Sequence, residues 1–241
     1  MTLNIEDVDE LKAPEPQRPR TPQAEAPSKP FWRRPWILPL FAITAFWLYM
    51  QIEPVAGVPE DQLQIPPHEN FPAYYPLLIT HMSFGTVTVL TVCLQLWPWL
   101  RINHPKWHRV SGRLYIVGAV VAAISGLIIV WWAPIPGQLG GAAMLLFWLG
   151  ITTAAYVTVR RGNYVLHRRF MLYSFAVPAN NFLAFFTYLA IDKFHIQIDF
   201  AYFLEYARWV PWVLNLMLIQ AWLYHTEKRP VTGPSAVRSR R

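Results

Sequence analysis

The sequence predicts an all-α integral membrane protein: a six-helix bundle with both termini in the cytoplasm and a disordered N-terminal tail. Three observations carry this prediction. Only 15% of the 241 residues are charged, whereas soluble globular chains average about 25%. The charged residues cluster, and between the clusters lie uncharged runs long enough to cross a bilayer as helices. The basic residues, finally, sort the connecting segments onto two sides of that bilayer.

These features exclude an ordinary soluble enzyme domain. The single cysteine, Cys93, lies in an apolar run, which excludes an intrachain disulfide, a cysteine-based zinc site, an iron–sulfur cluster and covalently attached haem. A metal or haem would therefore need His, Met, Tyr or carboxylate ligands. The net charge of +7 does not indicate nucleic acid, because the basic residues flank the apolar runs, where anionic lipid head groups lie.

The elements follow in order along the chain. Residues 1–34 form a basic, proline-rich cytoplasmic tail that we expect to be disordered, since it holds six prolines and many charges. The transmembrane domain covers 35–226, with a core of spans two to five over about 75–191, and a basic cytoplasmic tail follows at 227–241. The six uncharged runs are 36–52, 75–97, 114–132, 139–159, 170–191 and 209–224.

The positive charges orient these spans. Of the 21 Lys and Arg residues, 19 fall in the two tails and in the segments that follow the second and fourth runs. The other connecting segments hold only Lys193 and Arg208, together with seven acidic residues. Because cytoplasmic loops are enriched in Lys and Arg, both termini are expected in the cytoplasm. The expected location is the cytoplasmic (inner) membrane of a bacterium.

Polar and small residues recur at helical spacing inside the runs, which predicts the faces that point into the bundle. We expect spans two, three and five each to present one such stripe; helix packing alone is the competing explanation. The stripes are His81, Gly85, Thr88, Val92 and Gln95; His108, Ser111, Tyr115, Gly118, Ala122 and Ser125; and His167, Met171, Ser174, Pro178 and Asn181.

One candidate site lies at membrane depth. His81 is well inside an apolar run, and an ionisable group there is a functional candidate. Pro178 interrupts backbone hydrogen bonding at mid-membrane, and the amides of Asn180 and Asn181 follow it, which could form the floor of a ligand pocket. The alternative is structural: a neutral imidazole bonded to a neighbouring helix, and amides that satisfy the carbonyls freed by the proline. The candidate intramembrane site is His81, Asn180 and Asn181.

A second candidate site lies at the cytoplasmic ends of spans three and five. His108 and His167 each precede an arginine, in HRVSGRLY and HRRFMLYS, and two histidines from different helices are what a b-type haem requires. Neighbouring arginines would bind its propionates. The alternative is that these His-Arg pairs are interfacial and contact lipid phosphates. The candidate cofactor-binding set is His108, His167, Arg109, Arg113, Arg168 and Met171, with His108 and His167 as ligands of a haem iron or another metal.

These motifs resemble a bacterial family. A histidine that opens one span, HR-x-x-G-R-x-Y at the next span and HRR-x-M two spans later are similar to the domain of unknown function 2306 family of multi-pass membrane proteins. The resemblance covers roughly residues 76–186, and it implies the topology and the motif set but no established activity. The matching positions are His81, His108, Arg109, Gly112, Arg113, Tyr115, His167, Arg168, Arg169 and Met171.

Two classes of function remain open. The first is a membrane redox protein that holds haem or a metal on His108 and His167 and works with an unidentified redox partner. The second is a non-enzymatic transporter of small solutes or lipids, or a scaffold, whose His and Arg residues serve packing and head-group contact. In both classes the expected partners are the lipid bilayer and its anionic head groups, and nucleic acid is not expected.

Overall fold

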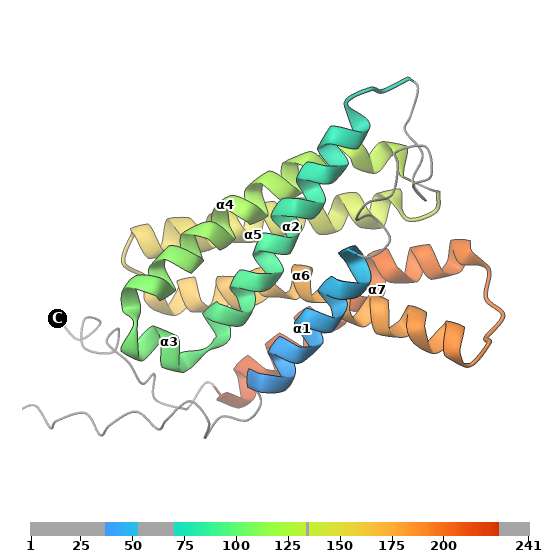
Figure 1. Cartoon of the computed structure of the whole chain (residues 1–241). Helices are drawn as coiled ribbons and strands as arrows, with labels where there is room; N and C mark the ends of the chain where they lie inside the picture. The colour runs from blue at the N-terminus through green and yellow to red at the C-terminus, as the bar shows by residue number, and fades with distance from the viewer. Residues whose placement is uncertain (1–36, 53–69, 134, 227–241) are drawn as a thin grey trace, which may run out of the picture.

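The computed structural model describes residues 37–52, 70–133 and 135–226, and within these ranges every regular element is a helix (Figure 1). The predicted tails at 1–34 and 227–241 lie outside the described residues, as does the segment 53–69. The helices are α1 Ile37–Ile52, α2 Tyr74–Leu96, α3 Pro98–Asn103, α4 Pro105–Ile129, η4 Val130–Trp132, α5 Gln138–Arg160, α6 Tyr164–Lys193 and α7 Phe200–Thr226.

Four of the described helices are long and apolar enough to cross a membrane: α2, α4 with its extension η4, α5 and α6. These are spans two to five of the sequence prediction, so the all-α membrane architecture of the core is confirmed. Helix α1 is apolar but short over its described residues. Helix α7 has sufficient length but is not among these four, and its sequence contains Glu205, Arg208, Asn215 and Gln220.

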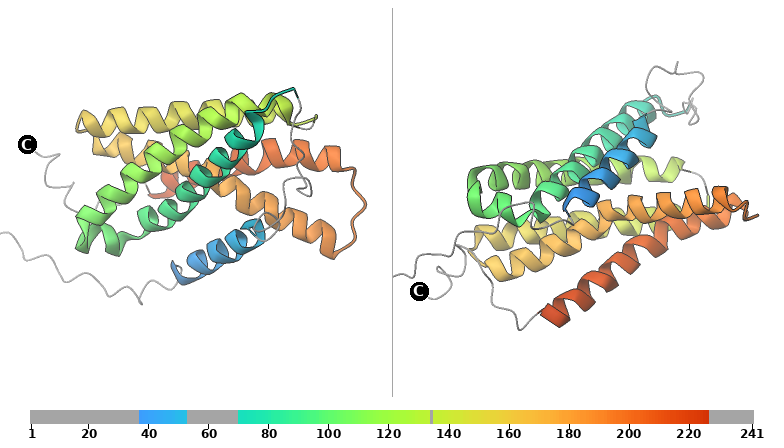
Figure 2. Two further views of the ribbon diagram at one scale, coloured as in Figure 1. Left: turned by 45° about the horizontal axis from the view of Figure 1, so that its top comes forward. Right: turned by 60° about the horizontal axis from the view of Figure 1, so that its bottom comes forward.

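The long helices pack in the order of the chain. Helix α2 lies along α4, α4 along α5, α5 along α6 and α6 along α7, while α7 also touches α5. Helix α1 lies outside this main bundle, across α2 and α6 (Figures 1 and 2). Its contacts there include Thr44 with Cys93, at 3.2 Å, and the ring of Trp47 against that of Phe182.

Proline and glycine occur at the turns at one end of the bundle, where α3 lies and where α4 and α6 begin. Pro98 and Pro105 begin α3 and α4, where a residue without an N–H costs nothing because the first turn has no intrahelical acceptor for it. Gly162 has a φ of +75°, which lets the chain reverse between α5 and α6. Asn163 then caps α6, because its side chain accepts a hydrogen bond from the Leu166 N–H at 3.1 Å.

Small residues let α4 and α5 approach their neighbours closely. Ala119, Ala122, Ala123 and Ala155 are all buried, and together with larger side chains they form one apolar core. The ring of Tyr115 lies within that core and is 0% exposed. An exposed side chain is one that no other part of this chain covers. On a helix that spans the membrane, most exposed side chains therefore face lipid.

Helices α4, α5, α6 and α7 are longer than the uncharged runs that predict them. Helix α4 begins nine residues before the run 114–132, and α6 begins six residues before the run 170–191. Charges at the membrane interface do not end a helix, because they remain in contact with water and head groups. Pro178 also stays inside α6, where the Asn181 amide donates to the Pro178 carbonyl at 3.2 Å and Asn215 of α7 donates to that of Ala176 at 3.1 Å.

Candidate functional site

Helices α4 and α6 both begin at the end of the bundle where α3 lies and run away from it (Figure 1). The hydroxyl groups of Tyr115 and Ser174 share a hydrogen bond of 2.6 Å across 59 residues of sequence. His108 precedes Tyr115 by seven residues, and His167 precedes Ser174 by seven. At 1.5 Å per residue, both histidines therefore lie about 10.5 Å from the bonded pair, at the same end and the same depth.

The side chain of His167 is held by the neighbouring helix. Its Nδ1 lies 2.8 Å from the carbonyl oxygen of Ala155 on α5, so Nδ1 carries the proton and donates it. Ala155 is 0% exposed, and its small side chain lets the imidazole reach the helix backbone. This bond leaves Nε2 with a free lone pair, which is the arrangement that ligand histidines use around metals.

His108 is held by its backbone rather than by its ring. Gln95 of α2 donates from Nε2 to the His108 carbonyl oxygen at 2.8 Å and to Ser111 Oγ at 2.6 Å. The His108 Nδ1 atom is buried and has no hydrogen-bond partner among the described residues. The imidazoles of His108 and His167 lie close enough for their charges to interact. The fold therefore places the two histidines that the sequence pairs at the same end of the bundle, one on α4 and one on α6.

A buried layer of hydroxyl groups lies deeper in the bundle. Ser174 Oγ also shares a 2.6 Å hydrogen bond with Thr152 Oγ1, and Trp148 Nε1 donates to Tyr115 Oη at 3.1 Å. We call Tyr115, Ser174, Thr152 and Trp148 the Tyr115 network. All four side chains are buried, so the network joins α4, α5 and α6 in a region from which water is excluded.

The predicted arginines do not all surround the histidine pair. The guanidinium of Arg168 lies over the ring of Trp222 on α7, 5.5 Å from its centroid. Arg109 and Arg113 are exposed on α4, while Met171 is buried in the core one turn after His167. Arg169, a family motif position, donates from Nε to the Tyr173 hydroxyl at 3.0 Å.

His81 lies in a different part of the bundle. Its Nδ1 donates to the carbonyl oxygen of Ala122 on α4 at 2.8 Å, and Gly126 leaves the room that the imidazole occupies. Ala122 follows His108 by 14 residues, so His81 is about 21 Å along α4 from the histidine pair. His81 therefore lies apart from the histidine pair, and it makes the bond to a neighbouring helix that the structural alternative requires.

The two asparagines do not share a site. Asn180 is 7% exposed, and its Oδ1 has no hydrogen-bond partner among the described residues. Asn181 is exposed, so the interior stripe of α6 does not continue to that residue. Helix α7 packs along α6 on both sides of Pro178, at Ala176 and at Thr187, whereas Ser174 contacts α4 before Pro178 and Phe182 contacts α1 beyond it.

Some of the polar contacts were missed at the level of sequence. Thr152 and Trp148 are single residues in an apolar run, where a hydroxyl or an indole gives no sign of a partner. Asn215 is a stronger signal, because an amide in the middle of an apolar run needs a hydrogen-bond partner. Among the described residues, no three His, Cys, Asp or Glu side chains gather to hold a metal ion.

Comparison with known proteins agrees with the motifs. The family model described as "Predicted membrane protein (DUF2306)" matches residues 78–223, which is more than half of the chain and includes the two histidines, the Tyr115 network and most of α7. No curated protein and no solved structure gave a match. The match confirms the resemblance found in the sequence: this chain belongs to the DUF2306 family of predicted membrane proteins.

Proposed function

We propose that this membrane protein binds a b-type haem between His108 and His167 and acts in electron transfer. The observation that carries the proposal is the register of α4 and α6, which the Tyr115–Ser174 bond holds and which puts both histidines at one depth. A haem iron takes one axial nitrogen on each face, so ligands on two parallel helices suit it. His167 offers Nε2, and His108 has a buried nitrogen without another partner.

The basic residues around this end support the proposal. Arg101 and Arg109 interact electrostatically with His108, and guanidinium groups bind carboxylates such as haem propionates. Met171 adds an apolar, buried side chain one turn deeper. A cofactor at this end would exchange electrons with a redox partner on the same face. No residue is assigned a catalytic role.

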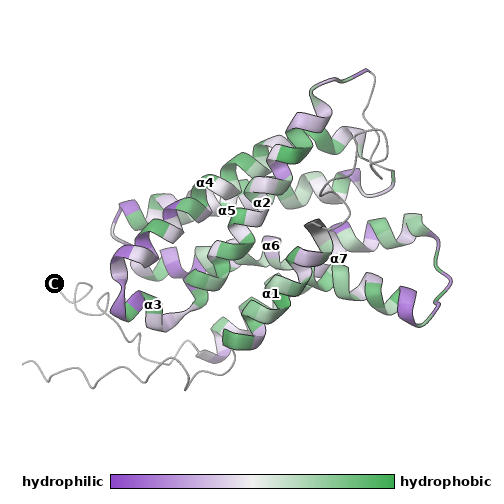
Figure 3. Ribbon diagram, viewed as in Figure 1, coloured by the Kyte–Doolittle hydropathy of each residue, from purple (hydrophilic) through white to green (hydrophobic). Residues whose placement is uncertain are grey.

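The proposal includes six spans in a bacterial inner membrane, with both termini in the cytoplasm. Helices α1 and α7 are its first and last spans. Its support is the sorting of charge in Figure 3, where α3, the beginnings of α4 and α6 and the end of α5 are polar at one end of the bundle. The acidic residues that the structure describes, Asp192, Asp199 and Glu205, occur near the other end of α6 and in and before α7. A reporter fused after Arg241 should report the cytoplasm, and a periplasmic signal would refute the span count.

The haem proposal is tested by spectroscopy on the purified protein. Protein from haem-replete cells should show a reduced b-type band after dithionite, and His108→Ala or His167→Ala should abolish it. His104→Ala is the matched control, because His104 is exposed at the same end of the bundle. A colourless wild-type preparation, or a band that survives both single substitutions, would refute the proposal.

A second candidate function is a non-enzymatic transporter or scaffold. The placement of two arginines favours it. Arg168 stacks on Trp222 of α7, and Arg169 donates a hydrogen bond to Tyr173 of its own helix, so neither contacts the histidine pair. The remaining cations would then contact anionic head groups. This candidate predicts that the wild type, His108→Gln and His167→Gln are all folded and colourless, and that His167→Gln lowers the Tm by no more than the loss of the bond to Ala155 explains. It is rejected if either substitution removes a bound chromophore.

A further inference from the structure

Among the residues that the structure describes, the acidic ones lie away from the cations at the histidine end of the bundle. The sequence contains no Asp or Glu between positions 70 and 191, and eight Lys and Arg residues fall in that stretch. All eight lie in α3, in the first turns of α4 and α6 or around the end of α5. This stretch of the chain therefore supplies no carboxylate to its own cations. The eight are Arg101, Lys106, Arg109, Arg113, Arg160, Arg161, Arg168 and Arg169.

Three of these cations form a stripe on the outside of α4. Lys106, Arg109 and Arg113 are spaced three and four residues apart, which places them on one helix face over about 10.5 Å. All three are exposed, and none makes a hydrogen bond or an ion pair with a described residue. By contrast, Arg168 and Arg169 at the beginning of α6 have aromatic partners.

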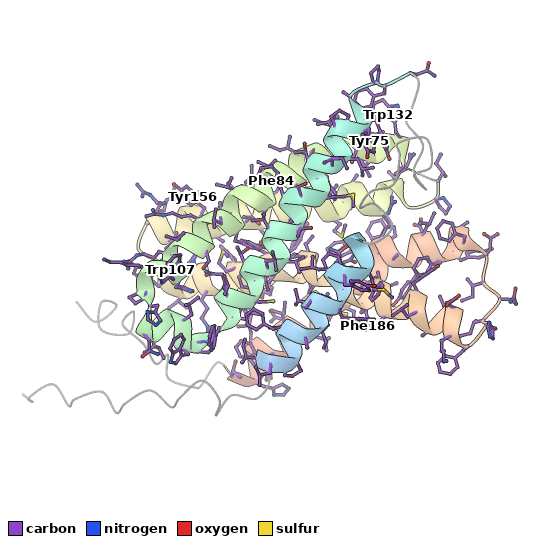
Figure 4. All side chains as sticks on the ribbon, in the orientation of Figure 1. Tyr75, Phe84, Trp107, Trp132, Tyr156 and Phe186 are labelled. Carbon is purple, nitrogen blue, oxygen red and sulfur yellow. The ribbon has the colours of Figure 1, made fainter. Side chains whose placement is uncertain are left out.

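An apolar stripe runs directly beside the cationic one. Trp107, Val110, Leu114 and Val117 follow the same spacing one residue later, and they are 65%, 45%, 51% and 55% exposed. Figure 4 labels Trp107 at the beginning of α4, at the edge of the bundle. Tryptophan at such a position marks the boundary between head groups and acyl chains. One surface of α4 therefore presents cations at this boundary and, beside them, a stripe of apolar side chains that continues into the membrane.

We propose that this surface is a binding site for an anionic glycerophospholipid. Its phosphate would accept charge-assisted hydrogen bonds from Lys106, Arg109 and Arg113, and an acyl chain would lie along Val110, Leu114 and Val117. The cations and the apolar stripe lie side by side. A lipid uses both, because it has an anionic head group and acyl chains, whereas a soluble anion would use only the cations. The inference rests on the proposed position of the beginning of α4 at the membrane interface, and it is independent of haem.

The test counts lipids bound to the full-length protein by native mass spectrometry. Protein in neutral detergent is titrated with phosphatidylglycerol or with phosphatidylcholine of the same acyl chains. Each cation near a membrane surface contributes roughly a fivefold gain in affinity, so Lys106→Gln/Arg109→Gln/Arg113→Gln should weaken phosphatidylglycerol binding about a hundredfold. Phosphatidylcholine binding should change little. Single substitutions should each weaken phosphatidylglycerol binding about fivefold, which keeps the test valid if the triple variant misfolds.

The control removes the same charge elsewhere: Arg238→Gln/Arg240→Gln/Arg241→Gln should leave phosphatidylglycerol binding unchanged. Equal affinity in the α4 variants and the wild type would overturn the proposal. So would displacement of the lipid by inorganic phosphate at equal concentration, since this would reveal a site for free phosphate. If lipid binds only after Glu6, Asp7, Asp9 and Glu10 are changed to amides, that acidic segment is the occupant and the proposal also fails. A colourless protein that keeps the lipid preference would contradict only the haem proposal.

Discussion

Replacing Gly126 by alanine tests how closely α2 and α4 pack at His81. A Cβ at this position would lie 2.8 Å from His81 Nδ1 and 2.9 Å from Leu145 Cδ1, both closer than real contacts allow. Overpacking of this kind costs about 1–3 kcal/mol. An imidazole that moves away also loses its bond to the Ala122 carbonyl, worth about 0.5–1.5 kcal/mol.

Against these losses, alanine is better than glycine in a helix by roughly 0.5–1 kcal/mol. The net expectation is a loss of about 1–3 kcal/mol in the free energy of unfolding. For a chain of this size, that corresponds to a fall in Tm of roughly 2–4 °C per kcal/mol. The assay is thermal unfolding of the detergent-solubilised protein, followed by circular dichroism.

Gly150→Ala is the matched control. Gly150 lies in another spanning helix, α5, and a Cβ at this position would meet no atom within 4 Å. Its Tm should equal or exceed that of the wild type. If Gly126→Ala has the same Tm as Gly150→Ala, the explanation by close packing at His81 is refuted. In a His81→Ala background, Gly126→Ala should cost less by at least about 0.5 kcal/mol, because one of its two clash partners is gone while Leu145 remains. Strict additivity of the two substitutions would contradict the explanation.

Three further substitutions examine other contacts. Tyr115→Phe leaves the buried donors of the Tyr115 network without their acceptor and should cost about 1–3 kcal/mol of unfolding free energy, whereas Tyr156→Phe on an exposed face should cost almost nothing. Gly140→Ala brings a Cβ within 2.7 Å of Trp209 Nε1, so the contact between α5 and α7 should loosen and cysteine cross-linking between these helices should fall. Asn215→Leu removes the amide bonded to α6 and should lower the unfolding free energy by roughly 0.5–1.5 kcal/mol, as measured by urea unfolding in micelles.

The positions of the spanning helices could be predicted closely from sequence. The uncharged run 75–97 corresponds to α2 at Tyr74–Leu96, and the run 139–159 to α5 at Gln138–Arg160. The prediction was less accurate where a helix continues past the apolar run. Helix α4 includes Lys106 and Arg109 in its first turns, because absence of charge marks the hydrocarbon region and not the end of the helix.

The candidate sites were only partly predictable. Helical spacing put His108 and Tyr115 on one face, and both are turned toward the bundle. The same rule put Asn181 inside, but the structure leaves that residue exposed and buries its neighbour Asn180. Periodicity describes one helix at a time, so it cannot show where a helix leaves one neighbour for another.

Composition and charge order alone determined that this is an α-helical membrane protein, because hydrocarbon excludes charges and requires every backbone group to be bonded within a helix. Those constraints act on each segment separately, so they can be read along the chain. Only the tertiary structure decided that Tyr115 meets Ser174, that His167 bonds the carbonyl of Ala155 and that His81 bonds that of Ala122. These contacts depend on how each helix is rotated and crossed against its neighbour, which is set by packing between residues far apart in sequence.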